Sequence, residues 1–306
     1  TARPWIGHLP RRWGGATHED LESADYLDPD GWPVAIPPEL GSIGTVILND
    51  LPPDALYTAG RYRLQFQGNG IVEVGGRATK VRYGKNEVTF DFTPGPGPVD
   101  IRIQRTDRAR KGNHVRNITV VKVDDIAAYQ AGDIFNPLWL DRLQGFTVLR
   151  FMDWMHTNNS SQSSWSNRPR PADYTWGTNG VPAEIILALA NLVGADPWIS
   201  LSHLADDDYA RRWAELAQSS LDPGRRIYIE YSNEVWNWQF QQAKWADEQA
   251  RARWNTSDVW LQYYTARAIE LAAIWTDAFG SDANDRLVRV LSTQTGRPPL
   301  QNEVLE

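Results

Sequence analysis

The sequence predicts an α/β protein with a parallel sheet in its C-terminal half and an antiparallel β-sandwich before it. Between Thr45 and Val123 polar and apolar residues alternate with a period of two, and Gly, Pro and Asn turns interrupt the alternation about every ten residues. After Asp124, apolar β-type runs alternate with helical patterns, as in parallel sheets. A chain of 306 residues can bury the core of one large domain or of two smaller ones.

Residues 1–44 follow neither period and are rich in Trp, Pro and Gly. We expect an ordered loop segment here, because so long a run without regular structure is unusual unless it is functional. Its Trp5, Trp13 and Trp32 are candidates for the wall of a binding cleft. A packed crossover is the alternative.

Residues 45–124 are predicted to form a jelly-roll-like β-sandwich, because short alternating strands at regular spacing are typical of two-sheet domains. It is either a carbohydrate-binding module or a structural insertion; no strand concentrates aromatic residues, which favours the insertion. The predicted strands are Thr45–Leu48, Gly60–Gly68, Gly70–Val74, Glu87–Phe92, Val99–Gln104 and Asn117–Val123.

Residues 125–306 are predicted to alternate strands and helices around a parallel sheet, whose ligands bind at the carboxyl ends of the strands. Asp206 to Asp208 precede one helix, where negative charge favours the N-terminal dipole; three consecutive Asp do not converge on one calcium ion. The predicted strands are Phe146–Met152, Trp198–Ser202, Ile227–Tyr231 and Leu287–Leu291, and the helices are Ala183–Val193, Ala205–Ser219, Gln239–Arg253 and Ser257–Phe279.

The central strand of this region ends on Asn233 and Glu234, which indoles follow at Trp236 and Trp238. Neighbouring strand residues point to opposite faces, so the two polar side chains can act together only where the strand gives way to a loop. Flat apolar faces suit stacking against a sugar ring, and a carboxyl group beside them suits a general acid for glycosides.

An Arg, a His and the Asn-Glu pair stand at the ends of three successive predicted strands. Phe146 to Trp154 carries Arg150, Trp198 to His203 ends on His203, and Glu230 precedes Asn233-Glu234. Over about residues 133–295 this arrangement resembles the (β/α)8-barrel glycoside hydrolases of clan A, most closely family 5. The clan's usual Pro after the Asn-Glu pair is Val235 here.

The resemblance implies a TIM-barrel-type fold and a retaining glycoside hydrolase that acts on a β-linked polysaccharide or oligosaccharide. Glu234 is then the acid/base, Asn233 binds a sugar hydroxyl, and Arg150 and His203 shape the substrate site. Glu230 either orients Arg150 or forms an ordinary interior ion pair with it, and we expect Arg150 to be buried. No position matches the family's nucleophilic Glu.

Indoles are the compositional outlier, with fifteen Trp against two Met. Trp236 and Trp154 lie at strand ends, and Trp165 and Trp176 lie in the long polar loop from Thr157 to Gly180. Because indoles stack on pyranose rings, we expect these four to contact substrate; the alternative for any Trp is that it fills the core.

Composition excludes several classes of partner. A net charge of −7 without a clustered basic face argues against nucleic acid, and no long apolar run predicts a membrane span. The chain has no cysteine, and no motif implies a metal or cofactor. A polysaccharide substrate favours a secreted or periplasmic location over a cytoplasmic one, although no signal pattern is visible.

The predicted parallel strands are too few to close a barrel, which leaves an apolar edge near Leu287–Leu291 that must be covered. We therefore expect either a homodimer, in which two partial barrels complete each other, or a fragment of a longer enzyme. The runner-up function is a non-catalytic carbohydrate-binding protein that uses the same aromatic residues. A third hypothesis is an isomerase or lyase with an α/β-barrel fold.

Overall fold

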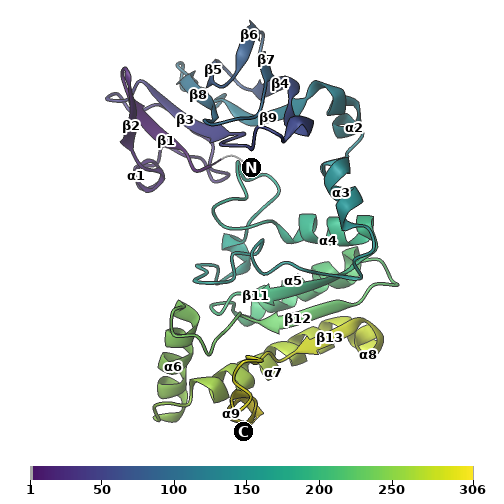
Figure 1. The fold of residues 1–306 in the computed structure, drawn as a ribbon. Coiled ribbons are helices and arrows are strands. Elements are labelled where there is room, and N and C mark those ends of the chain that lie inside the picture. Colours follow the sequence, from purple (N-terminus) through teal and green to yellow (C-terminus); the bar gives the residue numbers. More distant parts are fainter. Residues whose placement is uncertain (1–2, 306) are drawn as a thin grey trace. The chain divides into compact units, whose positions relative to one another are not determined.

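The computed structural model describes residues 3–305, which form two compact units (Figure 1). The first unit contains the described residues up to Ile134 together with Ala172–Thr178, and the second contains Phe135–Pro171 and the chain from Asn179 onwards. The structure is mixed α/β: the first unit has antiparallel sheets and the second has a parallel sheet. None of the described helices is long and apolar enough to cross a membrane.

The first unit contains a five-stranded and a four-stranded antiparallel sheet. The larger sheet has the order β2-β1-β3-β8-β5, with β1 Ile6–Leu9, β2 Arg12–Ala16, β3 Ser42–Ile47, β5 Gly70–Gly76 and β8 Val99–Thr106. The smaller has the order β6-β7-β4-β9, with β4 Gly60–Gln67, β6 Thr79–Gly84, β7 Glu87–Phe92 and β9 Arg116–Lys122. Helices α1 His18–Ser23 and α2 Ile126–Gln130 complete it.

Alternate strand residues supply the core of this unit. Leu64, Phe90 and Ile103, from β4, β7 and β8, have no exposed surface and belong to one apolar cluster. Their neighbours in each strand face outwards, which is the period-two alternation read from the sequence. The predicted antiparallel strands are therefore confirmed, with boundaries that shift by a few residues.

The expectation of a loop over residues 1–44 is wrong at both ends of the segment, and it is confirmed only between α1 and β3. This segment forms β1, β2, α1 and the first residues of β3, and β1 pairs with both β2 and β3. Glycines interrupt the polar–apolar alternation by which strands are predicted, because they carry no side chain. Gly7 is nevertheless required for close packing in β1, since a Cβ there would lie 2.4 Å from a methyl carbon of Leu40. The sequence also gave no sign of β6, whose residues are mostly exposed.

The second unit is built on a four-stranded parallel sheet with the order β10-β11-β12-β13. Within the described residues this sheet remains open, so the finer expectation of a TIM barrel is not confirmed. The strands are β10 Val148–Arg150, β11 Asp196–Leu201, β12 Ile227–Tyr231 and β13 Leu287–Val290. The helices are α3 Pro137–Leu143, α4 Ala183–Val193, α5 Asp207–Ser220, α6 Gln241–Trp254, α7 Trp260–Phe279, α8 Ala283–Arg286 and α9 Leu300–Leu305.

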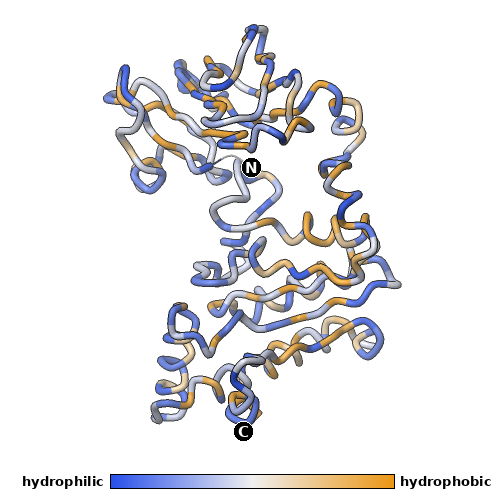
Figure 2. The backbone as a smooth tube through the Cα atoms, in the orientation of Figure 1, coloured by the Kyte–Doolittle hydropathy of each residue, from blue (hydrophilic) through white to orange (hydrophobic). Residues whose placement is uncertain are grey.

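The two faces of the parallel sheet differ in polarity. Ile227, Ile229 and Tyr231 of β12 join an apolar core with residues of α4, α5 and α7. On the opposite face of β12, Tyr228 stacks on Trp198 of β11, and Glu230 hydrogen bonds to the same Trp198. In Figure 2 the colour of hydrophobic residues accordingly alternates with paler and polar colours along the strands of this sheet.

β10 is shorter than predicted. Phe146 lies before the strand and is 57% exposed, so its expected place in a buried strand is wrong. β10 pairs with β11 on one side only, which leaves less surface to bury along this edge.

The expected acidic cap of α5 is confirmed. Asp206 has an extended backbone at the N-cap, and its Oδ1 accepts a hydrogen bond from the backbone N–H of Tyr209 at 2.6 Å. Asp207 and Asp208 occupy the first turn, where their charge interacts favourably with the helix dipole. These residues thus begin a helix.

Asp206→Ala should lower the free energy of unfolding by about 1 kcal/mol, because the N–H of Tyr209 loses its acceptor. Urea denaturation measures the change. Asp206→Asn is the matched control, since a carboxamide oxygen still caps the helix. Equal losses in the two variants would contradict the capping role.

Candidate active site

The carboxylate of Glu230 is the centre of a hydrogen-bond network on the polar face of the sheet. Its Oε2 accepts from Arg150 Nη2 at 2.8 Å, Trp198 Nε1 at 2.9 Å and Ser200 Oγ at 3.0 Å. Its Oε1 accepts from Ser292 Oγ at 2.6 Å. Glu230 is only 2% exposed, so these four donors replace the water that an ionised carboxylate requires.

Arg150 connects Glu230 with the end of β12. The same Nη2 that binds Glu230 donates to Asn233 Oδ1 at 3.0 Å, and the guanidinium lies 5.1 Å from the ring centre of Trp198. The expected burial of Arg150 is wrong, because its side chain is 35% exposed. The cause is the position of β10 at the edge of the sheet. The expected contact with Glu230 is confirmed.

The carboxamide of Asn233 is held from two sides. Its Oδ1 accepts from Arg150, and its Nδ2 donates to Asn158 Oδ1 at 3.0 Å. Gln242, a fully buried residue of α6, donates to both Asn158 Oδ1 and the backbone oxygen of Asn233, at 2.7 and 2.8 Å. Asn233 therefore has one fixed orientation.

Sequence reasoning missed Asn158 and Gln242. An Asn in a polar loop and a Gln in a polar helix give no signal in the sequence, because such residues are common in both. The neighbouring Asn159 takes part in the same contact: its Oδ1 accepts from the backbone N–H of Gln241 at 2.7 Å, and so caps α6 from a distant segment. Phe240, the N-cap residue, offers no side-chain cap of its own.

Glu234 follows a sharp change of backbone direction. Ser232 and Glu234 both have positive φ, 60° and 43°, although neither is glycine. Such conformations cost of order 1 kcal/mol each and concentrate at functional sites. The carboxylate of Glu234 is partly exposed, and its Oε2 accepts from Asn237 Nδ2 at 2.9 Å. Asn233 and Glu234 thus lie beyond the strand, where the sequence placed them.

His203 lies in an apolar environment after β11. It is 5% exposed, and desolvation lowers its pKa to about 4, so the imidazole is neutral at pH 7. Its ring packs edge-on against Trp245, with centroids 6.1 Å apart, and its Nδ1 is buried without a hydrogen-bond partner among residues 3–305. The contact with a substrate hydroxyl remains a prediction.

Trp154 and Trp165, two of the predicted platforms, are occupied in packing. Trp154 stacks on Trp139 at 5.6 Å. Trp165 packs against the ring of Tyr209 at 5.9 Å and under Arg168 at 4.3 Å. The indole faces used in these contacts are not free for a sugar, because the surrounding core already covers them.

Trp236 and Trp176 have different surroundings. Trp236 is partly buried and packs against the core of the second unit, whereas Trp176 lies in the segment Ala172–Thr178 of the first unit. Trp238, which was not among the predicted contacts, is 46% exposed and lies 5.1 Å from Trp260 in an edge-to-face pair. Trp238 is therefore more exposed to solvent than Trp236 and Trp245, the other indoles close to Glu234 in the sequence.

Within the part of the chain that the structure describes, no three His, Asp or Glu side chains are arranged to hold a metal ion. In comparisons with known proteins, the chain matches no family model and no curated protein.

Glu230→Gln should lower the free energy of unfolding by about 3 kcal/mol. The carboxamide keeps one accepting oxygen, but its NH2 group faces donors of the buried network, which then lose their acceptor. Urea denaturation measures the loss, and Glu248→Gln, at an exposed position of α6, is the control. A loss no larger than the control's would show that the network does not stabilise the fold.

Acidification should destabilise the second unit through His203. The pKa of His203 is about 4 in the folded protein and close to the ordinary 6.5 in the unfolded chain, so the unfolded state binds more protons between these values. Stability that is complete above pH 6.5 therefore falls as the pH approaches 4, by up to about 3 kcal/mol. Urea denaturation at pH 7 and 4.5 should show a smaller fall for His203→Asn; an equal fall would contradict this assignment.

Proposed function

We propose that the second unit is a glycoside hydrolase unit that acts on a β-linked polysaccharide or oligosaccharide, with Glu234 as the acid/base. The observation that carries the proposal is the chain of contacts from Glu230 through Arg150 to Asn233, which fixes a hydrogen-bonding carboxamide directly before Glu234. A catalytic acid needs such a neighbour, because substrate hydroxyls must be held while the glycosidic bond is protonated.

Asn233 has a donor to spare for the sugar. One N–H of its Nδ2 donates to Asn158, and no described residue accepts the other. A hydrogen bond from this group to a hydroxyl beside the scissile bond would strengthen as charge develops on the ring, and would then lower the barrier.

Glu234 has the exposure that an acid requires. Its side chain is partly exposed, and Asn237 is its one intramolecular hydrogen-bond partner among the described residues. Its carboxyl group is therefore free to donate a proton to a glycosidic oxygen, and its position is still fixed by the contact with Asn237. The neutral His203 is suited to bind a hydroxyl, and Trp238 offers a face for a pyranose ring.

Retention of configuration and a TIM-barrel-type architecture rest on the resemblance of the three strand ends to clan A enzymes. A retaining mechanism needs a second carboxylate about 5–5.5 Å from the acid. The sequence assigns no residue to that role. A substrate of this kind favours a secreted or periplasmic location over a cytoplasmic one. A homodimer would form at the edges of β10 and β13, which no described strand pairs with.

The second candidate is a non-catalytic carbohydrate-binding protein. The edge-to-face pair of Trp238 and Trp260 favours it, because an exposed aromatic platform binds sugar without any nucleophile. Wild-type protein that binds glycan and releases no product would support this candidate over the enzyme.

Glu234→Gln should reduce hydrolysis of aryl β-glycosides by about 10²–10⁴-fold and leave glycan binding unchanged, because the amide keeps the shape and loses the transferable proton. Turnover and binding are measured on the same preparation, with Glu248→Gln as the matched control. Turnover equal to that of the wild type would remove Glu234 from the mechanism.

A further inference from the structure

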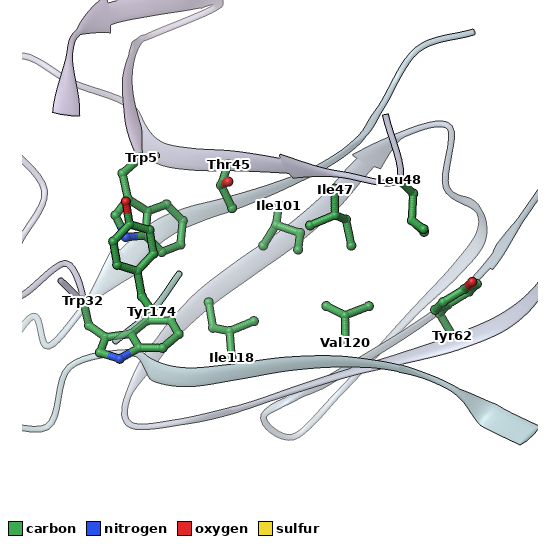
Figure 3. A pocket seen from close by; sticks show the side chains of 10 residues that line it. All are labelled: Trp5, Trp32, Thr45, Ile47, Leu48, Tyr62, Ile101, Ile118, Val120 and Tyr174. Carbon is green, nitrogen blue, oxygen red and sulfur yellow. The ribbon is translucent and has the colours of Figure 1, made fainter. Parts of the chain in front are cut away.

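A cavity of about 320 Å³ lies between the two sheets of the first unit (Figure 3). Ile47 and Ile101 of the larger sheet face Ile118 and Val120 of the smaller sheet across it. Native sandwich cores rarely contain voids much larger than a water molecule, whereas small-molecule sites begin at about 300 Å³. The size of the cavity therefore corresponds to a ligand.

One end of the cavity is closed by aromatic rings. Trp5 stacks on Tyr174 with ring centroids 5.2 Å apart, and Trp32 meets Tyr174 edge-on at 6.1 Å. Gly31 makes room for this cluster: its φ is 83°, and a Cβ there would lie 2.4 Å from Cδ1 of Tyr174. Burial raises the pKa of Tyr174 to about 12, so its hydroxyl is uncharged at neutral pH. This end presents aromatic surface without charge.

Three polar groups of the lining are already paired, whereas Trp32 Nε1 is buried without a hydrogen-bond partner among the described residues. Trp5 Nε1 donates to the oxygen of Gly31 at 2.8 Å, Thr45 Oγ1 to that of Arg3 at 2.6 Å, and Tyr62 OH to that of Thr58 at 2.6 Å. The nitrogen of Trp32 lies on the side of its ring away from the aliphatic wall (Figure 3). None of the described residues that line the cavity is charged. An ion inside it would lose its hydration without compensation.

The cavity is accessible from solvent. Ile47, Leu48, Ile118 and Val120 line it and are each only partly buried, unlike the fully buried core residues Leu64 and Phe90 nearby in the sandwich. A void left by imperfect packing would be enclosed on all sides. Here the aliphatic walls lead from the surface to the aromatic end, which gives a ligand a route of entry.

We propose that this cavity binds a small, uncharged, aromatic molecule, with its ring against the Trp5–Trp32–Tyr174 cluster and its remaining carbon atoms between the aliphatic walls. An apolar cavity of ~150 Å³ already holds benzene, so 320 Å³ has room for a molecule of two rings or one ring with a short chain. The site belongs to the first unit and does not depend on the chemistry proposed for Glu234.

The test uses the full chain and N-phenyl-1-naphthylamine, a neutral dye whose fluorescence rises in apolar surroundings. Titration should give saturable binding of one dye per chain. The anionic dye 1-anilinonaphthalene-8-sulfonate has the same ring skeleton with a sulfonate added. It should bind at least about tenfold more weakly, because the described lining residues include no cation.

Val120→Phe and Ile47→Phe fill the cavity from opposite sheets and should each weaken binding of the neutral dye by at least about tenfold, or about 1.4 kcal/mol. Ile71→Phe, at a residue of β5 that is 41% exposed, is the control and should leave binding unchanged. Circular dichroism and thermal unfolding establish that each variant is folded.

Binding that both filled variants retain, or equal binding of the two dyes, would overturn the proposal. So would an absence of binding by the wild type. If neither filled variant folds, the neutral dye must raise the melting temperature of the wild type and the anionic dye must not; any other result also overturns the proposal.

Discussion

A buried carboxylate with four donors organises the second unit. Glu230 is only 2% exposed, and transfer of an unpaired carboxylate out of water costs several kcal/mol or more, so the donors replace the lost hydration. The donors come from β10, from two residues of β11 and from the segment after β13. Satisfying Glu230 therefore requires every strand of the parallel sheet to be present in one register, in which Ser200 lies directly beside Glu230.

The candidate site is an extension of that network. The hydrogen bond to Glu230 fixes Arg150, which in turn donates to Asn233. Asn158 and Gln242 hydrogen bond to Asn233 from the other side. The left-handed residues on both sides of Asn233 are thus held in strained conformations by surrounding contacts. A strained backbone conformation persists only where contacts with the surrounding structure outweigh the residue's own conformational preference.

Local patterns predicted the elements well, and long-range contacts explain what they missed. The predicted strands Glu87–Phe92 and Ile227–Tyr231 and the helix Ala183–Val193 coincide with β7, β12 and α4, because alternation and capping are local signals. β1 and β2 were missed because Gly7 and its neighbours depend on close approach to another segment. Contacts with distant segments also decide whether an indole is packed or exposed. The sequence therefore could not distinguish Trp154, which stacks on another ring, from Trp238, which is exposed.

The unequal exposure of Arg150 and Glu230 decides what their pair contributes. A guanidinium that is 35% exposed is partly hydrated, so its attraction to Glu230 is screened and adds little stability by itself. Only Nη2 is paired with described residues, which leaves Nε and Nη1 free to donate. A fully buried Arg150 would have needed further acceptors for those groups. Because β10 lies at the edge of the sheet, the guanidinium of Arg150 is fixed at Nη2, and its other nitrogens have no partner among the described residues.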